Sequence, residues 1–123
     1  RKLMNRTAAE TTAEIAARVL RAREIQRERF AAENETAQGN DKRIFCNAAM
    51  NNRMIEKYCP LSDECKSLLE KIIERNGLSA RACSRIIKLA RTIADLAESS
   101  DISPEHILEA AGYRFLDKQN IFE

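Results

Sequence analysis

The stretch "NGLSARACSRIIKLARTIADLA", residues 76–97, contains the signals that decide the fold. Asn76 and Gly77 predict the end of one helix, because glycine adopts the left-handed conformation of a helix C-terminus without steric cost. Ser79 is suited to cap the next helix, since its hydroxyl can accept a backbone N–H of the first turn. Arg81 is then the second helical residue, where a cation opposes the helix dipole by roughly 0.3–1 kcal/mol. The stretch therefore predicts a new helix with one charge that is misplaced for local stability.

This helix is predicted to run to about Ala97 and to be strongly amphipathic. Apolar residues fill about half of its circumference and predict the buried side: Ala82, Cys83, Ile86, Ile87, Leu89, Ala90, Ile93, Ala94, Leu96 and Ala97. Polar residues cluster on the other side: Arg81, Arg85, Lys88, Thr92 and Asp95. Arg91 and Asp95 are spaced i, i+4, which predicts a surface ion pair worth a few tenths of a kcal/mol.

Two further helices flank this one in the sequence. The preceding helix begins after Ser62, and its apolar residues follow the spacing of a single helix face: Cys65, Leu68, Leu69, Ile72 and Ile73. The following helix has Ser103 as its cap and Pro104 at its first position, and it is predicted to run toward Tyr113. Its apolar residues are Ile107, Leu108 and Ala111.

The N-terminal part of the chain predicts one long helix. Thr11 or Thr12 with Glu14 is typical of a helix start, and this helix is predicted to end near Phe30 or Ala32. Its predicted buried face consists of Ile15, Val19, Ala22, Gln26 and Phe30. Its arginines are Arg18, Arg21, Arg23, Arg27 and Arg29. They do not share one side and alternate with glutamates, so we expect a solvated face in preference to a nucleic-acid stripe.

The segment between this helix and Ser62 is less regular. Residues 31–42 are polar and predict a link. The asparagines in residues 47–51 predict a turn, and a short helix is expected over residues 53–58. Met50 and Met54 are expected in the core.

The composition is typical of a single helical domain. Charged residues make up 33% and hydrophobic residues 44% of 123 residues, with three glycines, two prolines and no tryptophan. We therefore expect one all-α domain over residues 1–123, a bundle of about five helices in which residues 1–11 are irregular. The formal net charge of +2 indicates neither nucleic acid nor membrane as a partner. No apolar run approaches the roughly 20 residues that cross a bilayer, so we expect a cytoplasmic location.

The sequence predicts neither a metal site nor a catalytic site within this chain. The cysteines, Cys46, Cys59, Cys65 and Cys83, lack the close pairing of zinc ligands and are expected to be reduced and buried. The single histidine, His106, is expected to be structural. No G-x-x-x-x-G-K-[ST] loop is present to hold phosphates. We therefore expect that the chain alone is not an enzyme.

Several segments resemble the C-terminal lid region of ComM-type AAA+ ATPases, which are related to magnesium chelatase. "ETTAEIAARVLRAREIQRERF" resembles the first lid helix, and "CNAAM" and "MIEKYCPL" resemble the middle segment. "GLSARACSRIIKLARTIADL" resembles the most recognisable stretch of the family, and "DISPEHILEAAGYR" resembles the closing helix. The resemblance covers most of the chain and implies a helical lid that is a C-terminal fragment of a longer ATPase.

The resemblance also implies a role for Arg81. In such ATPases the lid packs over a nucleotide held by a preceding α/β core, and an arginine near the start of one lid helix contacts the phosphates as the second sensor. Arg81 matches that position, and a phosphate at a helix N-terminus would account for the misplaced cation. Arg85 and Lys88 follow on the same face as candidate supporting residues. The Walker loops belong upstream, so ATP and Mg²⁺ are expected only in the full-length protein.

The implied partners are the upstream ATPase core of the same chain, a homo-hexamer of the full-length protein, and DNA as the substrate of a ComM-type motor; no membrane is expected. The motor subunit of a metal chelatase is an alternative. An alternative of another class is an autonomous helical module that binds nucleic acid through the arginines of the first helix together with Arg81, Arg85 and Lys88. A third is a protein-interaction bundle with no link to nucleotide.

Overall fold

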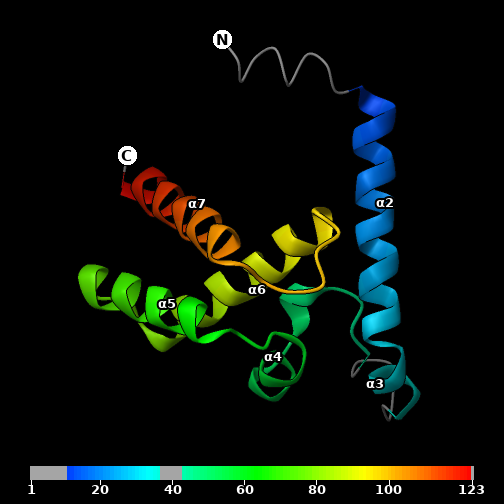
Figure 1. Cartoon of the computed structure of the whole chain (residues 1–123), viewed down its shortest axis with the longest axis horizontal. Helices are drawn as coiled ribbons and strands as arrows, with labels where there is room; N and C mark the ends of the chain where they lie inside the picture. The colour runs from blue at the N-terminus through cyan, green and yellow to red at the C-terminus, as the bar shows by residue number, and fades with distance from the viewer. Residues whose placement is uncertain (1–10, 37–42, 123) are drawn as a thin grey trace.

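The computed structural model describes residues 11–36 and 43–122, with side chains described up to Tyr113 except that of Thr36. Within these ranges the chain is helical and contains no strand (Figure 1). The elements are α2 (Thr12–Arg29), α3 (Ala31–Thr36), the 3-10 helix η2 (Asn47–Ala49), α4 (Asn52–Tyr58), α5 (Asp63–Asn76), α6 (Ala80–Leu96) and α7 (Pro104–Phe122). The prediction of an all-α fold is confirmed. Residues 1–10, for which the sequence predicts irregular structure, lie outside the described ranges.

The central element is α6. It packs against α7, α2, α4 and η2, and α7 also packs against α5. In Figure 1, α6 crosses the middle of the molecule, with α5 and α7 on one side and α2 on the other. The predicted apolar side of α6 is buried at Ile86, Ala90 and Ala94. These residues belong to a hydrophobic core composed of Phe30, Ile44, Met50, Met54, Ile55, Cys59, Cys65, Leu69, Ile86, Ala90, Ala94, Ile102, Ile107, Ala110 and Ala111.

The junction between α5 and α6 has the predicted geometry. Gly77 ends α5 in the left-handed conformation, with φ 60° and ψ 43°, and its N–H donates to the carbonyl of Ile73. The hydroxyl of Ser79 accepts the backbone N–H of Ala82 at 3.2 Å, which caps α6. Arg81 is therefore the second residue of α6, in the first turn.

The start of α2 is also as predicted, but its packing is not. The backbone N–H of Glu14 donates to the Thr11 hydroxyl at 3.0 Å, and the Glu14 carboxylate accepts the Thr11 N–H at 2.8 Å. Phe30 is fully buried and meets the ring of Tyr58 edge to face, with centroids 5.5 Å apart. Ile15, predicted on the buried face, is 41% exposed. The prediction was wrong there because α2 packs through its C-terminal half, where Ala22 and Gln26 are buried.

The structure contains one short helix that the sequence does not predict, and one helix that is longer than predicted. The segment predicted as a polar link begins with the short helix α3. The last helix, predicted to run toward Tyr113, continues to Phe122. The predicted turn and short helix are found as η2 and α4, and Met50 and Met54 are buried as expected.

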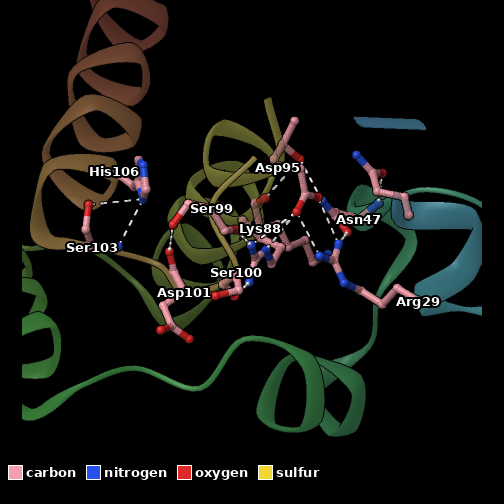
Figure 2. Close-up of polar contacts among 12 residues, drawn as sticks. Arg29, Asn47, Lys88, Asp95, Ser99, Ser100, Asp101, Ser103 and His106 are labelled. Carbon is pink, nitrogen blue, oxygen red and sulfur yellow. Dashed lines mark hydrogen bonds and ion pairs between the residues drawn. The ribbon is translucent and has the colours of Figure 1, made fainter. Parts of the chain in front are cut away.

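His106 is structural, as predicted. Its Nδ1 accepts the backbone N–H of Ser103 at 3.0 Å and lies 3.1 Å from the Ser103 hydroxyl (Figure 2). The ring thus binds one of the backbone groups that a helix start leaves without an intrahelical partner. His106 therefore stabilises the first turn of α7.

The four thiols differ in accessibility. Cys59 and Cys65 are buried, Cys83 is half-buried and Cys46 is exposed. The expectation that the cysteines are buried is wrong for Cys46, which lies directly before η2. Burial raises the pKa of Cys59 to about 11. That thiol therefore stays protonated and unreactive near neutral pH.

None of the helices in residues 11–36 and 43–122 is both long enough and apolar enough to cross a membrane.

Candidate functional site

The three candidate site residues lie together along an open groove beside α6. The groove has a volume of about 510 Å³ and is lined by Ala48, Arg81, Arg85, Ile86, Lys88, Leu89, Thr92 and Ala110. Ala48 belongs to η2 and Ala110 to α7, so the groove lies between these two elements on the surface of α6. Among the described residues, its lining contains three cations and no carboxylate. We call it the α6 groove.

The three cations of the α6 groove differ in their bonding. Arg81 and Arg85 are exposed, and neither side chain forms an ion pair or a hydrogen bond within the described part of the chain. Lys88 is half-buried, and its ammonium donates to the backbone carbonyl of Ala48 at 3.2 Å. Arg81 and Arg85 are therefore available to an external anion, whereas Lys88 already has an acceptor.

A second polar site lies at the other end of α6. Asp95 is 1% exposed, and its carboxylate accepts two hydrogen bonds from the guanidinium of Arg29, at 2.7 and 2.8 Å (Figure 2). Arg91 approaches the same carboxylate at 3.1 Å and is 3% exposed. The predicted surface pair of Arg91 and Asp95 therefore exists, but the prediction of its location was wrong, because α2 and η2 cover it.

Asn47 completes this site, which we call the buried ionic cluster and define as Arg29, Asn47, Arg91 and Asp95. Its side-chain amide donates to Asp95 at 2.9 Å and to the hydroxyl of Thr92 at 3.0 Å, while its carbonyl oxygen accepts from Arg29 at 2.9 Å. Its backbone N–H donates to the side chain of Gln26 at 3.0 Å. A residue that the sequence predicts only as part of a turn therefore joins α2 to α6.

Arg91 has further acceptors beyond the end of α6. Its guanidinium donates to the carbonyls of Ser99 at 2.8 Å and Ser100 at 3.1 Å. These bonds hold the connection to α7 against the helix end, where a cation is also favoured by the dipole. Arg91 is thus a structural residue.

The arginines of α2 do not form a free cationic stripe. Arg29 is part of the buried ionic cluster, which contradicts the prediction that it is solvated. Arg21 pairs with Glu98 at 2.9 Å, and Arg27 pairs with Glu24 at 3.2 Å. The pairs formed by Arg21 and Arg27 are exposed, as a solvated face predicts.

Two charges of α6 oppose its dipole. Arg81 is the second residue and Asp95 the next to last, so a cation lies at the positive end and an anion at the negative end. Sequence reasoning recognised the first of these and missed the second, although the same signal was present. Asp95 is balanced by Arg29, Arg91 and Asn47, whereas Arg81 has no balancing anion in the described residues.

Residues 9–114 match the model of the family described as "Magnesium chelatase, subunit ChlI C-terminal". The chain belongs to this family. The range that matches the ChlI C-terminal family contains every residue that lines the α6 groove and every member of the buried ionic cluster.

Curated relatives of this ChlI C-terminal domain are longer proteins. The chain is 41% identical over 105 residues to "Competence protein ComM" of Haemophilus influenzae, covering 85% of the chain and 18% of that protein. It is 38% identical to YifB of Salmonella typhimurium and 36% identical to YifB of Escherichia coli, covering 75% and 89% of the chain and 18% and 19% of those proteins. The chain thus spans about a fifth of the length of these relatives. No solved structure matches it. The resemblance to the lid region of ComM-type, magnesium-chelatase-related AAA+ ATPases is confirmed.

Proposed function

We propose that this domain is the nucleotide-sensing lid of a magnesium-chelatase-like ATPase, in which Arg81 contacts the phosphates of bound ATP as the second sensor. The observation that supports the proposal is the uncompensated charge of Arg81. Arg81 is exposed, opposes the dipole of α6, and lines a groove whose described residues include no carboxylate. An arginine at a locally unfavourable position is accounted for by an anion that is supplied from outside the domain.

The chemistry available to Arg81 is that of a planar, permanently charged donor. Its guanidinium can donate two parallel hydrogen bonds to phosphate oxygens. The backbone N–H groups of Ala80 and Arg81, which have no acceptor in the described residues, favour an anion at the same end of α6. As negative charge moves during phosphoryl transfer, a fixed cation at this position would stabilise the transition state. Mg²⁺ bound with ATP would neutralise phosphate charge and orient the leaving group. In the residues that the structure describes, no group of three His, Cys, Asp or Glu side chains is placed to hold a metal ion.

For the whole protein we propose a ring-forming ATPase, a homo-hexamer whose upstream α/β core holds ATP and Mg²⁺ and whose lid contributes Arg81 and contacts to the neighbouring subunit. We further propose DNA as the substrate of this motor. The relative named a competence protein supports a ComM-type motor over the motor subunit of a metal chelatase. The proposals of a hexameric ring and of a DNA substrate rest on the family and not on contacts within this domain.

The decisive experiment measures ATP turnover of the full-length protein with Arg81→Ala. We expect turnover to fall by tenfold or more, because the loss of one charge-assisted phosphate contact in the transition state raises the barrier by at least about 1.4 kcal/mol. The purified domain alone is expected to show no turnover above background. Normal turnover in the Arg81 variant would contradict the sensor assignment.

The matched control is Arg23→Ala. Arg23 is an exposed arginine of α2 that does not line the α6 groove, so its removal changes the net charge equally and should leave turnover within about twofold. Arg91, which lies on the same helix as Arg81, is unsuitable as a control, because its side chain is buried in the ionic cluster. An equal loss of turnover in the Arg23 variant would indicate a general effect of charge.

A further inference from the structure

The α6 groove presents two free guanidinium groups at a regular spacing. Arg81 and Arg85 both line it, both are exposed, and neither has an anionic partner in the described residues. They are four residues apart on one helix, which corresponds to a rise of about 6 Å. Like charges at this spacing destabilise a helix. An anion with charge on more than one group would relieve the repulsion between the two arginines as well as the conflict of Arg81 with the dipole.

Lys88 contributes differently to the same groove. Its bond to the carbonyl of Ala48 fixes η2 as the wall opposite the arginines. The hydroxyl of Thr92 donates to the Lys88 carbonyl at 3.2 Å and accepts from Asn47, so the wall is also connected to the buried ionic cluster. Figure 2 shows Lys88 close to this cluster. Lys88 therefore holds the shape of the groove.

We propose that the α6 groove binds two linked phosphoryl groups of one polyphosphate ligand, with Arg81 contacting one group, Arg85 contacting the next, and Lys88 acting as a positioning residue. This inference rests on the proposed function, because it concerns the ligand of the same groove. It extends that function by making Arg85 a second phosphate contact and by removing Lys88 from the set of contacts.

The dimensions and charge distribution of the groove favour a polyphosphate over a nucleic acid. A volume of about 510 Å³ is in the range of small-molecule sites. A neighbouring cavity of about 410 Å³ continues along α6. It is lined by Arg18, which has a partner, by the carboxylate of Glu109 and by apolar side chains such as that of Ile93. The arginines of α2 that would extend a basic surface are paired at Arg21, Arg27 and Arg29. Nucleic-acid binding requires an extended basic surface. Arg23 is exposed but lies outside both cavities, and among the described residues that line them the cations without a partner are Arg81 and Arg85 of the α6 groove.

The test titrates this chain with inorganic tripolyphosphate and, separately, with orthophosphate at constant ionic strength, monitored by backbone amide chemical shifts. We expect tripolyphosphate to bind about tenfold more tightly than orthophosphate, because it contacts both arginines. Arg81→Gln and Arg85→Gln should each weaken tripolyphosphate binding by about three- to tenfold. Lys88→Gln should weaken it by less than about twofold while shifting the amide signals of η2. Arg23→Gln is the charge control and should change nothing.

Three outcomes would overturn the proposal. Unchanged tripolyphosphate binding in Arg85→Gln would mean a site for a single phosphate. Equal weakening by Arg23→Gln would mean unspecific charge attraction. Tighter binding of a single-stranded oligodeoxynucleotide, at equal phosphate concentration and with a steep dependence on salt, would make the groove part of a nucleic-acid surface.

ATP turnover of the full-length protein separates this inference from the proposed function. If Arg81→Ala and Arg85→Ala both lose turnover, both statements are supported. If Arg81→Ala loses turnover and Arg85→Ala does not, the sensor assignment stands and the two-phosphate inference fails. If Arg81→Ala turns over normally while both arginines still bind tripolyphosphate in the isolated chain, the groove is an anion site and the sensor assignment fails.

Discussion

The two ends of α6 use the same residue types in opposite ways. At its N-terminal end Arg81 and Arg85 are exposed and have no partner in the described residues. At its C-terminal end Arg91 is 3% exposed and bonds to Asp95, which is itself 1% exposed. Arg81 and Arg85 are spaced i, i+4, and so are Arg91 and Asp95. The helical repeat therefore does not decide whether an arginine is structural or free.

What decides is the element that lies across from each arginine. α2 and η2 cover the C-terminal end and bring Arg29 and Asn47 to the carboxylate. At the N-terminal end, η2 and α7 border the groove, and the lining residues that the structure describes on these two elements, Ala48 and Ala110, carry no charge. At the C-terminal end of α6 the charges are neutralised within the domain and stabilise the fold. At the N-terminal end Arg81 and Arg85 are not neutralised by a described residue, and we expect an external ligand to bind there.

The strongest test of this contrast removes the central anion. Asp95→Ala leaves Arg29 and Arg91 without their carboxylate in a buried site, so we expect the free energy of unfolding to fall by roughly 3–5 kcal/mol. Denaturant titration followed by circular dichroism measures the change. Asp101→Ala is the control, because Asp101 is exposed and its removal should stay within about 0.5 kcal/mol. A loss below about 1 kcal/mol for Asp95→Ala would mean that the cluster does not stabilise the fold.

Arg91→Ala is expected to have the next largest effect. It removes one of two guanidinium groups from Asp95 and leaves the carbonyls of Ser99 and Ser100 without their donor. Because Arg29 still pairs with the carboxylate, we expect a loss of roughly 2–3 kcal/mol, against the few tenths that a surface pair would give. The same denaturant titration decides between the two values.

A third arrangement tests how much burial contributes. Glu33 accepts hydrogen bonds from Arg53 at 2.9 Å, Tyr58 at 2.8 Å and Lys57 at 3.2 Å. The two cationic donors, Arg53 and Lys57, have side chains that are more than half exposed. The hydrogen bond from Arg53, together with those from Tyr58 and Lys57, lowers the pKa of Glu33 from 4.5 to about 2. Glu33 is thus a carboxylate with three donor residues, like Asp95, but its side chain is 12% exposed against 0% for Asp95, and both of its cations are exposed.

Because the folded pKa of Glu33 is below its ordinary value, its contribution to stability is complete above about pH 4.5 and is lost as the pH falls toward 2. We expect the melting temperature to decrease over this window, and Glu33→Gln to reduce the decrease. High salt should weaken the effect because the cations are exposed. An identical pH profile in the variant would mean that other carboxylates cause the acid sensitivity.

The smallest effect on stability is expected for Arg81→Ala. The substitution removes a cation from the positive end of α6 and breaks no bond in the described residues, so the domain should be unchanged or more stable by up to about 1 kcal/mol. Thermal unfolding of the isolated domain measures this. A loss above about 1 kcal/mol would mean that Arg81, like Arg91, is structural.

Local signals in the sequence predicted the helices well. Gly77 and Ser79 end one helix and start the next through bonds to residues within four positions, and the bonds between Thr11 and Glu14 are equally local. Such geometry depends on the chain nearby and can be read without the fold. The groove residues Arg81 and Arg85 were predictable for the same reason, since one helix presents both on one face.

The buried ionic cluster was not predictable in this way. Arg29 and Asn47 reach Asp95 from 66 and 48 positions away, and nothing in their own neighbourhood indicates the partner. The helical periodicity of the sequence therefore predicts Asp95 on the polar, solvated side of its helix. One signal was available: an anion in the last turn of a helix is locally unfavourable, and such a residue usually has a tertiary reason.

The long separation between Arg29 and Asp95 has a consequence for the order of folding. Contacts of α6 with α7 join two helices that follow one another in the sequence, and such local contacts are expected to form early. The pairing of Arg29 with Asp95 closes a loop of more than 60 residues, which costs conformational entropy. This ion pair stabilises the fold only after the surrounding helices have excluded water from the site. We therefore expect α2 to dock last during folding and to detach first. Amide hydrogen exchange in α2 should then report a smaller opening free energy than exchange in α6, while the α5, α6 and α7 core stays closed.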